Sequence, residues 1–190
     1  MMIISNILGI ILFLFLLWKR LKEDYSYEKI FNFAVLILTG LLIGFLVSKK
    51  ILPSYWFFIE IIGIAIGFTI GVIKLKFKFI EAFDGVVIGL LPWVTLFFLS
   101  DSIKNSALSS FLAFWVSLTC IFLFFLTESH YRRVGFSAVF IAGLFFLIRA
   151  LISLFSLEAI SFSGNLESYI SGTVAFGFFL LLYKLSRNKK

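Results

Sequence analysis

Residues 56–73 read WFFIEIIGIAIGFTIGVI, and Glu60 is the only charged residue among them. An apolar run of this length can cross the hydrocarbon core of a bilayer as a helix, which takes about 20 residues. A helix is expected rather than a strand, because lipid offers no hydrogen-bond partner to an open strand edge. The sequence therefore predicts a membrane-spanning helix in this stretch.

Similar apolar runs occupy most of the remaining chain. The predicted spans are residues 3–18, 30–48, 55–73, 80–99, 107–126, 134–156 and 168–185. The composition agrees with this interpretation, since 62% of the residues are hydrophobic and 14% are charged, whereas soluble domains carry about 25% charged residues. We therefore predict an all-α, polytopic transmembrane helix bundle with seven spans, forming a single domain over residues 1–190.

The basic residues gather in alternate connections between the predicted spans. One set of connections, together with the final segment, holds Lys19, Arg20, Lys22, Lys29, Lys74, Lys76, Lys78, Arg132, Arg133, Lys184, Arg187, Lys189 and Lys190. The other set holds only Lys49, Lys50 and Lys104. Because basic residues favour the cytoplasmic side, this pattern predicts the N-terminus outside and the C-terminus in the cytoplasm. It also accounts for the net charge of +7 without a nucleic-acid partner.

Glycines recur at every fourth residue in three predicted spans. They are Gly40 and Gly44 in the second, Gly63, Gly67 and Gly71 in the third, and Gly85 and Gly89 in the fourth. Small residues at this spacing let helix backbones approach closely in lipid, so we predict that these positions are helix-packing sites. Ordinary helix packing and a tight core built from these three spans both remain open.

Two ionisable residues lie inside predicted spans. Placing Arg149 inside a span costs on the order of 3 kcal/mol on insertion scales. With the predicted topology, Arg149 and Glu60 both fall within roughly 10 Å of the outer boundary, where we expect them to meet. One interpretation is a structural ion pair, or an arginine that reaches the outer head groups. The other is an anionic-lipid site in which Arg149 binds the phosphate.

Two further acidic residues, Glu81 and Asp84, lie near the inner end of the fourth span. We expect them to form a solvated or interfacial cluster with Lys74, Lys76 and Lys78. No metal-ligand spacing, nucleophile motif or phosphate-binding loop is found in the sequence, so no metal or cofactor is expected.

Three parts of the chain resemble one known family when taken together. They are IGIAIGF at residues 62–68 followed by FIEAFD at 79–84, RVGF at 133–136 followed by LFFLIR at 144–149, and ESYIS at 167–171 followed by GFFLLL at 177–182. In order and placement these segments resemble the third and fourth, sixth, and last spans of the phosphatidylglycerol–prolipoprotein diacylglyceryl transferases. Members of that family are seven-span bacterial enzymes of lipoprotein maturation.

This resemblance implies a multi-pass protein of the bacterial cytoplasmic membrane that handles lipid or lipoprotein. It implies phosphatidylglycerol and a lipoprotein precursor as partners, with Arg149 at the position that holds the lipid phosphate. The family's His-Gly-Gly and its Arg and Asn signature correspond here to WFFIE at 56–60 and WVTLFFLSD at 93–101. The glutamate that follows its arginine by four is Ser153 here. Glu60 is the one nearby candidate base, so catalysis stays an open question.

Two other functions are compatible with the sequence. The first is a non-catalytic lipid-binding or scaffolding protein that partners another membrane protein, which the missing motif residues favour. The second is a small transporter, which is disfavoured because few polar residues could line a path and because Pro53 and Pro92 are the only prolines.

Overall fold

The computed structural model describes residues 2–106, 108–130, 135–155 and 166–187, and within these ranges it contains seven α-helices and no strand. The helices are α1 (Met2–Leu21), α2 (Tyr27–Lys50), α3 (Trp56–Leu75), α4 (Phe79–Asn105), α5 (Leu108–His130), α6 (Phe136–Phe155) and α7 (Leu166–Arg187), with a short 3-10 turn, η1 (Pro53–Tyr55), before α3. All seven are long and apolar enough to cross a membrane. The chain is an all-helical, multi-pass membrane protein, as the apolar runs predict.

The largest difference from the predicted boundaries is at the end of α4. This helix was expected to end near residue 99, but it continues through the polar stretch to Asn105. The Asp101 carboxylate accepts hydrogen bonds from Asn105 at 2.8 Å and from Ser110 of α5 at 2.5 Å. Polar side chains can extend a helix beyond the hydrocarbon core, so the apolar run alone underestimates its length.

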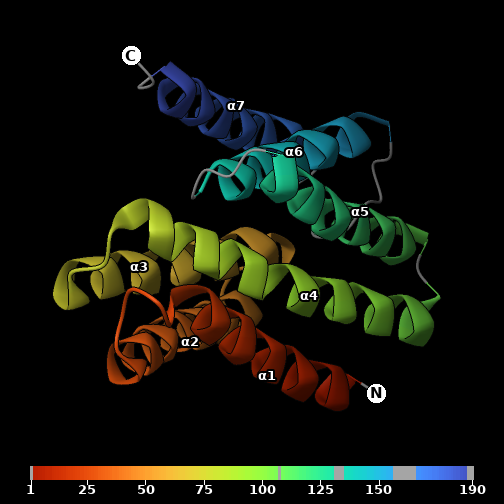
Figure 1. Cartoon of the computed structure of the whole chain (residues 1–190). Helices are drawn as coiled ribbons and strands as arrows, with labels where there is room; N and C mark the ends of the chain where they lie inside the picture. The colour runs from red at the N-terminus through yellow and green to blue at the C-terminus, as the bar shows by residue number, and fades with distance from the viewer. Residues whose placement is uncertain (1, 107, 131–134, 156–165, 188–190) are drawn as a thin grey trace.

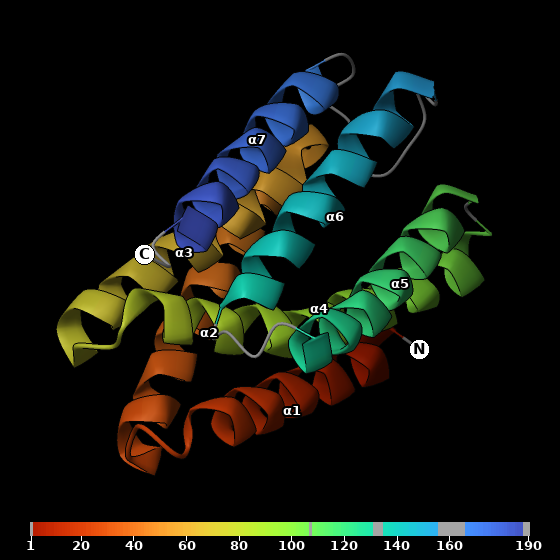
Figure 2. The same cartoon turned by 45° about the horizontal axis from the view of Figure 1, so that its top comes forward.

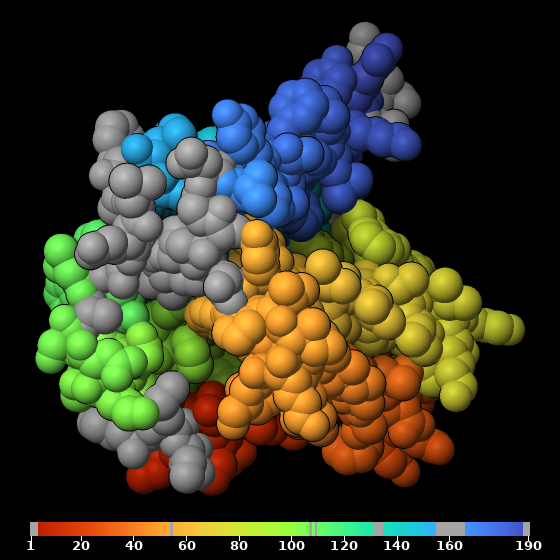
Figure 3. Space-filling view, turned by 180° about the vertical axis from the view of Figure 1, so that it is seen from behind, coloured from red at the N-terminus to blue at the C-terminus, as the bar shows by residue number. Residues whose placement is uncertain are grey.

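Figures 1 and 2 show that α4 lies between α1 on one side and α5 and α6 on the other. The remaining neighbouring pairs are α2–α3, α6–α7, α5–α6 and α1–α2. From behind, the surface of α3 lies between those of α2 and α7 (Figure 3). The N-terminal end of α3 can therefore contribute to a site shared with α6 and α7.

The α2–α3 pair is held together by backbone contact between glycines. A Cβ atom on Gly40 would lie 2.2 Å from the carbonyl oxygen of Gly63, and a Cβ on Gly63 would lie 2.2 Å from that of Gly40. One turn further on, a Cβ on Gly67 would lie 2.4 Å from the Leu36 carbonyl oxygen. No side chain fits at these positions, so glycine permits the two helices to pack at this separation.

The glycines of α4 have a different partner from the one expected. Gly85 lies against Leu17 and Leu21, and Gly89 lies against Phe13, all of which belong to α1. The interpretation of a tight core made by the second, third and fourth spans is therefore wrong for the fourth, whose glycines face the first. Sequence spacing shows which face of a helix is small but does not show which helix it meets.

Large apolar side chains are exposed on every helix, including Phe31 of α2, Ile73 of α3, Phe122 of α5 and Phe176 of α7. On a soluble protein such a surface would be an aggregation hazard. In a bilayer the same side chains contact lipid tails, which are as apolar as they are. The exposed surface therefore agrees with the membrane placement.

Candidate functional site

An ion pair between α6 and α7 forms the centre of the candidate site. Arg149 lies near the C-terminal end of α6, and Glu167 is the second residue of α7. The Nε–H of Arg149 donates to Oε1 of Glu167 at 2.5 Å; the arginine side chain is 11% exposed and the glutamate side chain is fully buried. Because the carboxylate balances the guanidinium, the charge can be held within apolar surroundings.

The first turn of α3 covers the guanidinium with aromatic rings. The Cζ atom of Arg149 lies 3.7 Å from the centroid of the Phe57 ring and 5.6 Å from that of Phe58. An arginine over an aromatic face is stabilised by about 2 kcal/mol or more when it is desolvated. Phe57 also packs in an apolar cluster with Phe146 of α6 and Ala175 of α7, so three helices meet at the arginine.

The two oxygens of the Glu167 carboxylate have different surroundings. Oε1 accepts from Arg149 and also from the hydroxyl of Ser171, at 2.8 Å, one turn along α7. Oε2 is buried and has no hydrogen-bond partner in the part of the chain that the structure describes. Leaving a buried acceptor unsatisfied costs about 1–3 kcal/mol, and more for a charged group. This oxygen is therefore the atom of the site at which a further donor is expected.

The expected meeting of Glu60 with Arg149 is not found. Arg149 pairs with Glu167 and not with Glu60, and the Glu60 backbone lies against α2, where a Cβ on Gly44 would be 3.0 Å from the Glu60 Cα. The third span does approach the arginine, as expected, but Phe57 and Phe58 make the contact. The partner carboxylate comes from α7 instead.

Sequence reasoning missed Glu167 and Ser171 as members of the site. The last span was predicted to begin at residue 168, which left Glu167 just outside it. One available signal was that Glu167 and Ser171 are four residues apart, a spacing that places both on one face of a helix. The acidic residue would also lie in the first turn, where the helix dipole favours a negative charge.

A second polar cluster joins α1, α4 and α5 at the other end of the bundle. Arg20 Nε donates to Asp84 Oδ2 at 2.5 Å, and its Nη1 donates to Glu128 Oε1. The Asp84 side chain is only 1% exposed. Of the two alternatives expected for this cluster, a solvated Asp84 is wrong, because the packing of α1 on α4 buries this carboxylate and places Arg20 beside it.

Glu81 does form the expected pair with a lysine near the start of α4. Its carboxylate accepts from Lys78 Nζ and from the Tyr25 hydroxyl, both at 2.8 Å. The hydrogen bond to Glu81 raises the pKa of the Lys78 ammonium, and burial raises the pKa of the Tyr25 hydroxyl. Lys78 is thus charged and Tyr25 neutral at neutral pH, and together they tie the α1–α2 connection to the start of α4.

No family model, curated protein or solved structure matches the chain. Among the described residues, no group of three or more His, Cys, Asp or Glu side chains is placed to hold a metal ion.

Proposed function

We propose that this chain is a lipid-binding protein of the bacterial cytoplasmic membrane that holds the head group of an anionic phospholipid at Arg149 and Glu167. With the N-terminus outside and the C-terminus in the cytoplasm, as the basic residues predict, this site lies in the outer half of the bilayer. The bound lipid is phosphatidylglycerol, and the binding serves a lipoprotein precursor or another membrane protein.

The observation that carries the proposal is the buried, unpartnered Oε2 of Glu167 beside a guanidinium, in the part of the chain that the structure describes. A guanidinium matches the geometry of a phosphate group. A glycerol head group adds hydroxyl donors next to that phosphate, and one of these can satisfy Oε2. A lipid that offers both groups is therefore favoured over one that offers phosphate alone.

We further propose common ancestry with the prolipoprotein diacylglyceryl transferases. In that family a glutamate follows the arginine of the sixth span by one turn. Here that position is Ser153, whose hydroxyl donates to the Ala150 carbonyl of its own helix at 2.7 Å. Glu167 supplies a carboxylate to the arginine from α7 instead. The arginine–carboxylate pair would then be retained, with Glu167 supplying the carboxylate.

Binding without transfer is the activity that we propose. Transferring a diacylglyceryl group to a cysteine thiol needs a base to generate the thiolate. The candidate base, Glu60, does not pair with Arg149, and its backbone packs against α2. A lipid-binding or scaffolding role needs no such base, and the charged pair of Arg149 and Glu167 is the group that we propose contacts the lipid.

The test is retention of labelled phosphatidylglycerol by the purified protein in bilayer discs, with phosphatidic acid as the competitor that lacks head-group hydroxyls. The double variant Arg149→Leu/Glu167→Leu removes both charges and leaves neither one buried alone, so it should fold. We expect it to lose preferential phosphatidylglycerol binding. Lys50→Gln, at the exposed end of α2, should bind as the unaltered protein does. Equal binding by the double variant would overturn the proposal.

The same preparations should be offered a lipobox peptide and phosphatidylglycerol labelled in the diacylglycerol moiety. We expect no labelled peptide. Turnover that disappears in the double variant would instead show that the family's reaction is retained on other residues, and would replace binding by catalysis as the function.

A further inference from the structure

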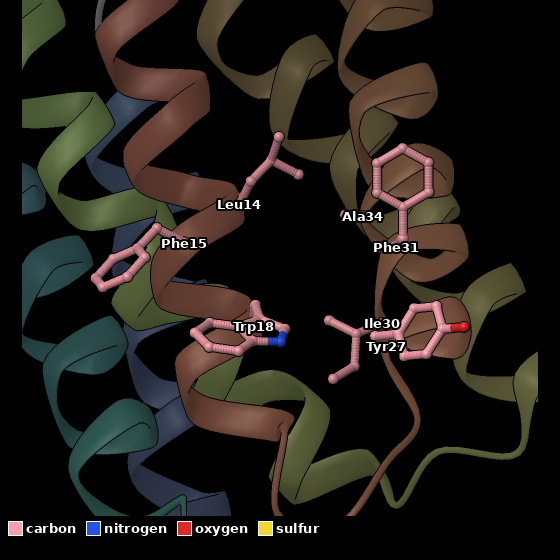
Figure 4. Close-up of a pocket in the computed structure, with 7 residues that line it drawn as sticks. All are labelled: Leu14, Phe15, Trp18, Tyr27, Ile30, Phe31 and Ala34. Carbon is pink, nitrogen blue, oxygen red and sulfur yellow. The ribbon is translucent and has the colours of Figure 1, made fainter.

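An apolar groove separates α1 from α2 near the connection between them. It has a volume of about 400 Å³ and lies between side chains of the two helices (Figure 4). The lining residues are Leu14, Phe15 and Trp18 from α1 and Tyr27, Ile30, Phe31 and Ala34 from α2. This volume falls within the range of small-molecule sites, which is about 300–1,000 Å³. The groove does not include any residue of the Arg149–Glu167 site.

The two ends of the groove differ in polarity. At the end near the connection, Trp18 is 42% exposed and Tyr27 is 80% exposed. The ammonium of Lys22 lies 5.0 Å from the centroid of the Trp18 ring. Trp and Tyr favour the level of the lipid head groups. At the other end, Leu14 and Ala34 present only hydrocarbon, so the polarity changes along the groove as it does along a phospholipid.

We propose that this groove is a second lipid site, which takes one acyl chain of a glycerophospholipid and places the phosphate at Lys22. By the predicted topology it faces the inner leaflet, whereas the Arg149–Glu167 site faces the outer one. The connection carries Glu23 and Asp24 beside Lys22, and the first turn of α2 adds Glu28 and Lys29. Because acidic residues outnumber basic ones in residues 22–29, the site recognises the phosphate common to phospholipids and does not select an anionic head group.

A transmembrane helix fits this groove less well than an acyl chain. A helix is at least 10 Å across with its side chains, whereas a single acyl chain is far narrower and can lie between the side chains of two neighbouring helices. A helix from a second copy would also place an apolar surface against the Lys22 ammonium, which a phosphate would neutralise.

Quenching of tryptophan fluorescence by phospholipids brominated on an acyl chain can test this proposal. One variant keeps only Trp18, and a matched variant keeps only Trp115, a half-exposed residue of α5 outside the groove that reports on bulk lipid. We expect Trp18 to reach half-maximal quenching at a several-fold lower mole fraction of brominated lipid than Trp115. The same difference is expected with phosphatidylethanolamine and with phosphatidylglycerol.

Two substitutions in the Trp18-only protein make the test specific. Ala34→Phe should fill the groove and bring the Trp18 curve onto that of Trp115. Lys22→Gln should raise the half-maximal mole fraction of phosphatidylethanolamine and of phosphatidylglycerol by a similar, several-fold factor, because it removes a charge-assisted hydrogen bond to the phosphate. Lys50→Gln, which removes the same charge elsewhere, should leave the half-maximal mole fraction unchanged. Identical curves for Trp18 and Trp115, or a Trp18 curve that Ala34→Phe leaves unchanged, would overturn the proposal.

Two controls distinguish lipid in this groove from lipid at the charged pair and from a protein that covers the groove. Arg149→Leu/Glu167→Leu should leave Trp18 quenching unchanged. A negative result for lipid binding at one site therefore does not contradict lipid binding at the other. If Trp18 is shielded from every brominated lipid and becomes accessible on dilution of the protein, a second copy covers the groove, and the lipid proposal is wrong.

Discussion

At the scale of single residues, Arg149 and Glu167 should be strongly coupled in stability. Removing one member of a buried ion pair leaves an uncompensated charge and costs about 3–5 kcal/mol, whereas replacing both by apolar residues is often neutral. We expect Arg149→Leu and Glu167→Leu each to lower the free energy of unfolding by this amount, and the double variant to recover most of it. Denaturation in mixed micelles, analysed as a double-mutant cycle, measures the coupling. Additive losses would contradict the pairing.

The sequence identified one member of this pair and not the other. Arg149 was found because a charge inside an apolar run is costly and needs a reason. Its partner could not be chosen in the same way, since Glu60 and Glu167 both lie near the same end of the predicted bundle. Helix packing decides between them: the first turn of α3 turns Phe57 toward the arginine, while α7 places Glu167 beside it.

At the scale of elements, the seven helices could be predicted because bilayer thickness fixes the length of an apolar run. Their neighbours could not, since apolar helices in lipid have no hydrophobic force that selects one partner over another. Asp84 shows the consequence. It was expected among lysines close to it in sequence, but it binds Arg20 of α1, whose proximity depends on the packing of α1 against α4.

The α2–α3 pair gives a prediction at this scale. Gly40→Ala would place a Cβ 2.2 Å from the Gly63 carbonyl oxygen, well inside van der Waals contact, so the helices must separate. Overpacking of this kind costs about 1–3 kcal/mol. Gly177→Ala is the matched control, because nothing lies within 4 Å of its Cβ position. It should be neutral or stabilising, as alanine is the better helix former by about 1 kcal/mol. The midpoint temperatures of thermal unfolding of the two variants measure this difference. Equal midpoints would contradict close contact between α2 and α3.

At the scale of the whole molecule, the two proposed lipid sites depend on one orientation. Both ends of α2 offer exposed positions for testing it: Glu23, in the connection before the helix, and Lys49, in its last turn. In a background with the buried Cys120 replaced by serine, Glu23→Cys and Lys49→Cys each provide a single reactive thiol. The distribution of basic residues predicts that a membrane-impermeant maleimide labels Lys49→Cys in intact cells and Glu23→Cys only after lysis.

The opposite labelling pattern would have a specific meaning for function. It would place Arg149 and Glu167 in the inner leaflet and the groove beside Trp18 in the outer one. The proposed role for a lipoprotein precursor assumes that Arg149 lies in the outer leaflet, so this outcome would contradict that role. Labelling as expected would leave the charged pair in the outer leaflet and Lys22 at the inner leaflet, whose surface is the more negative.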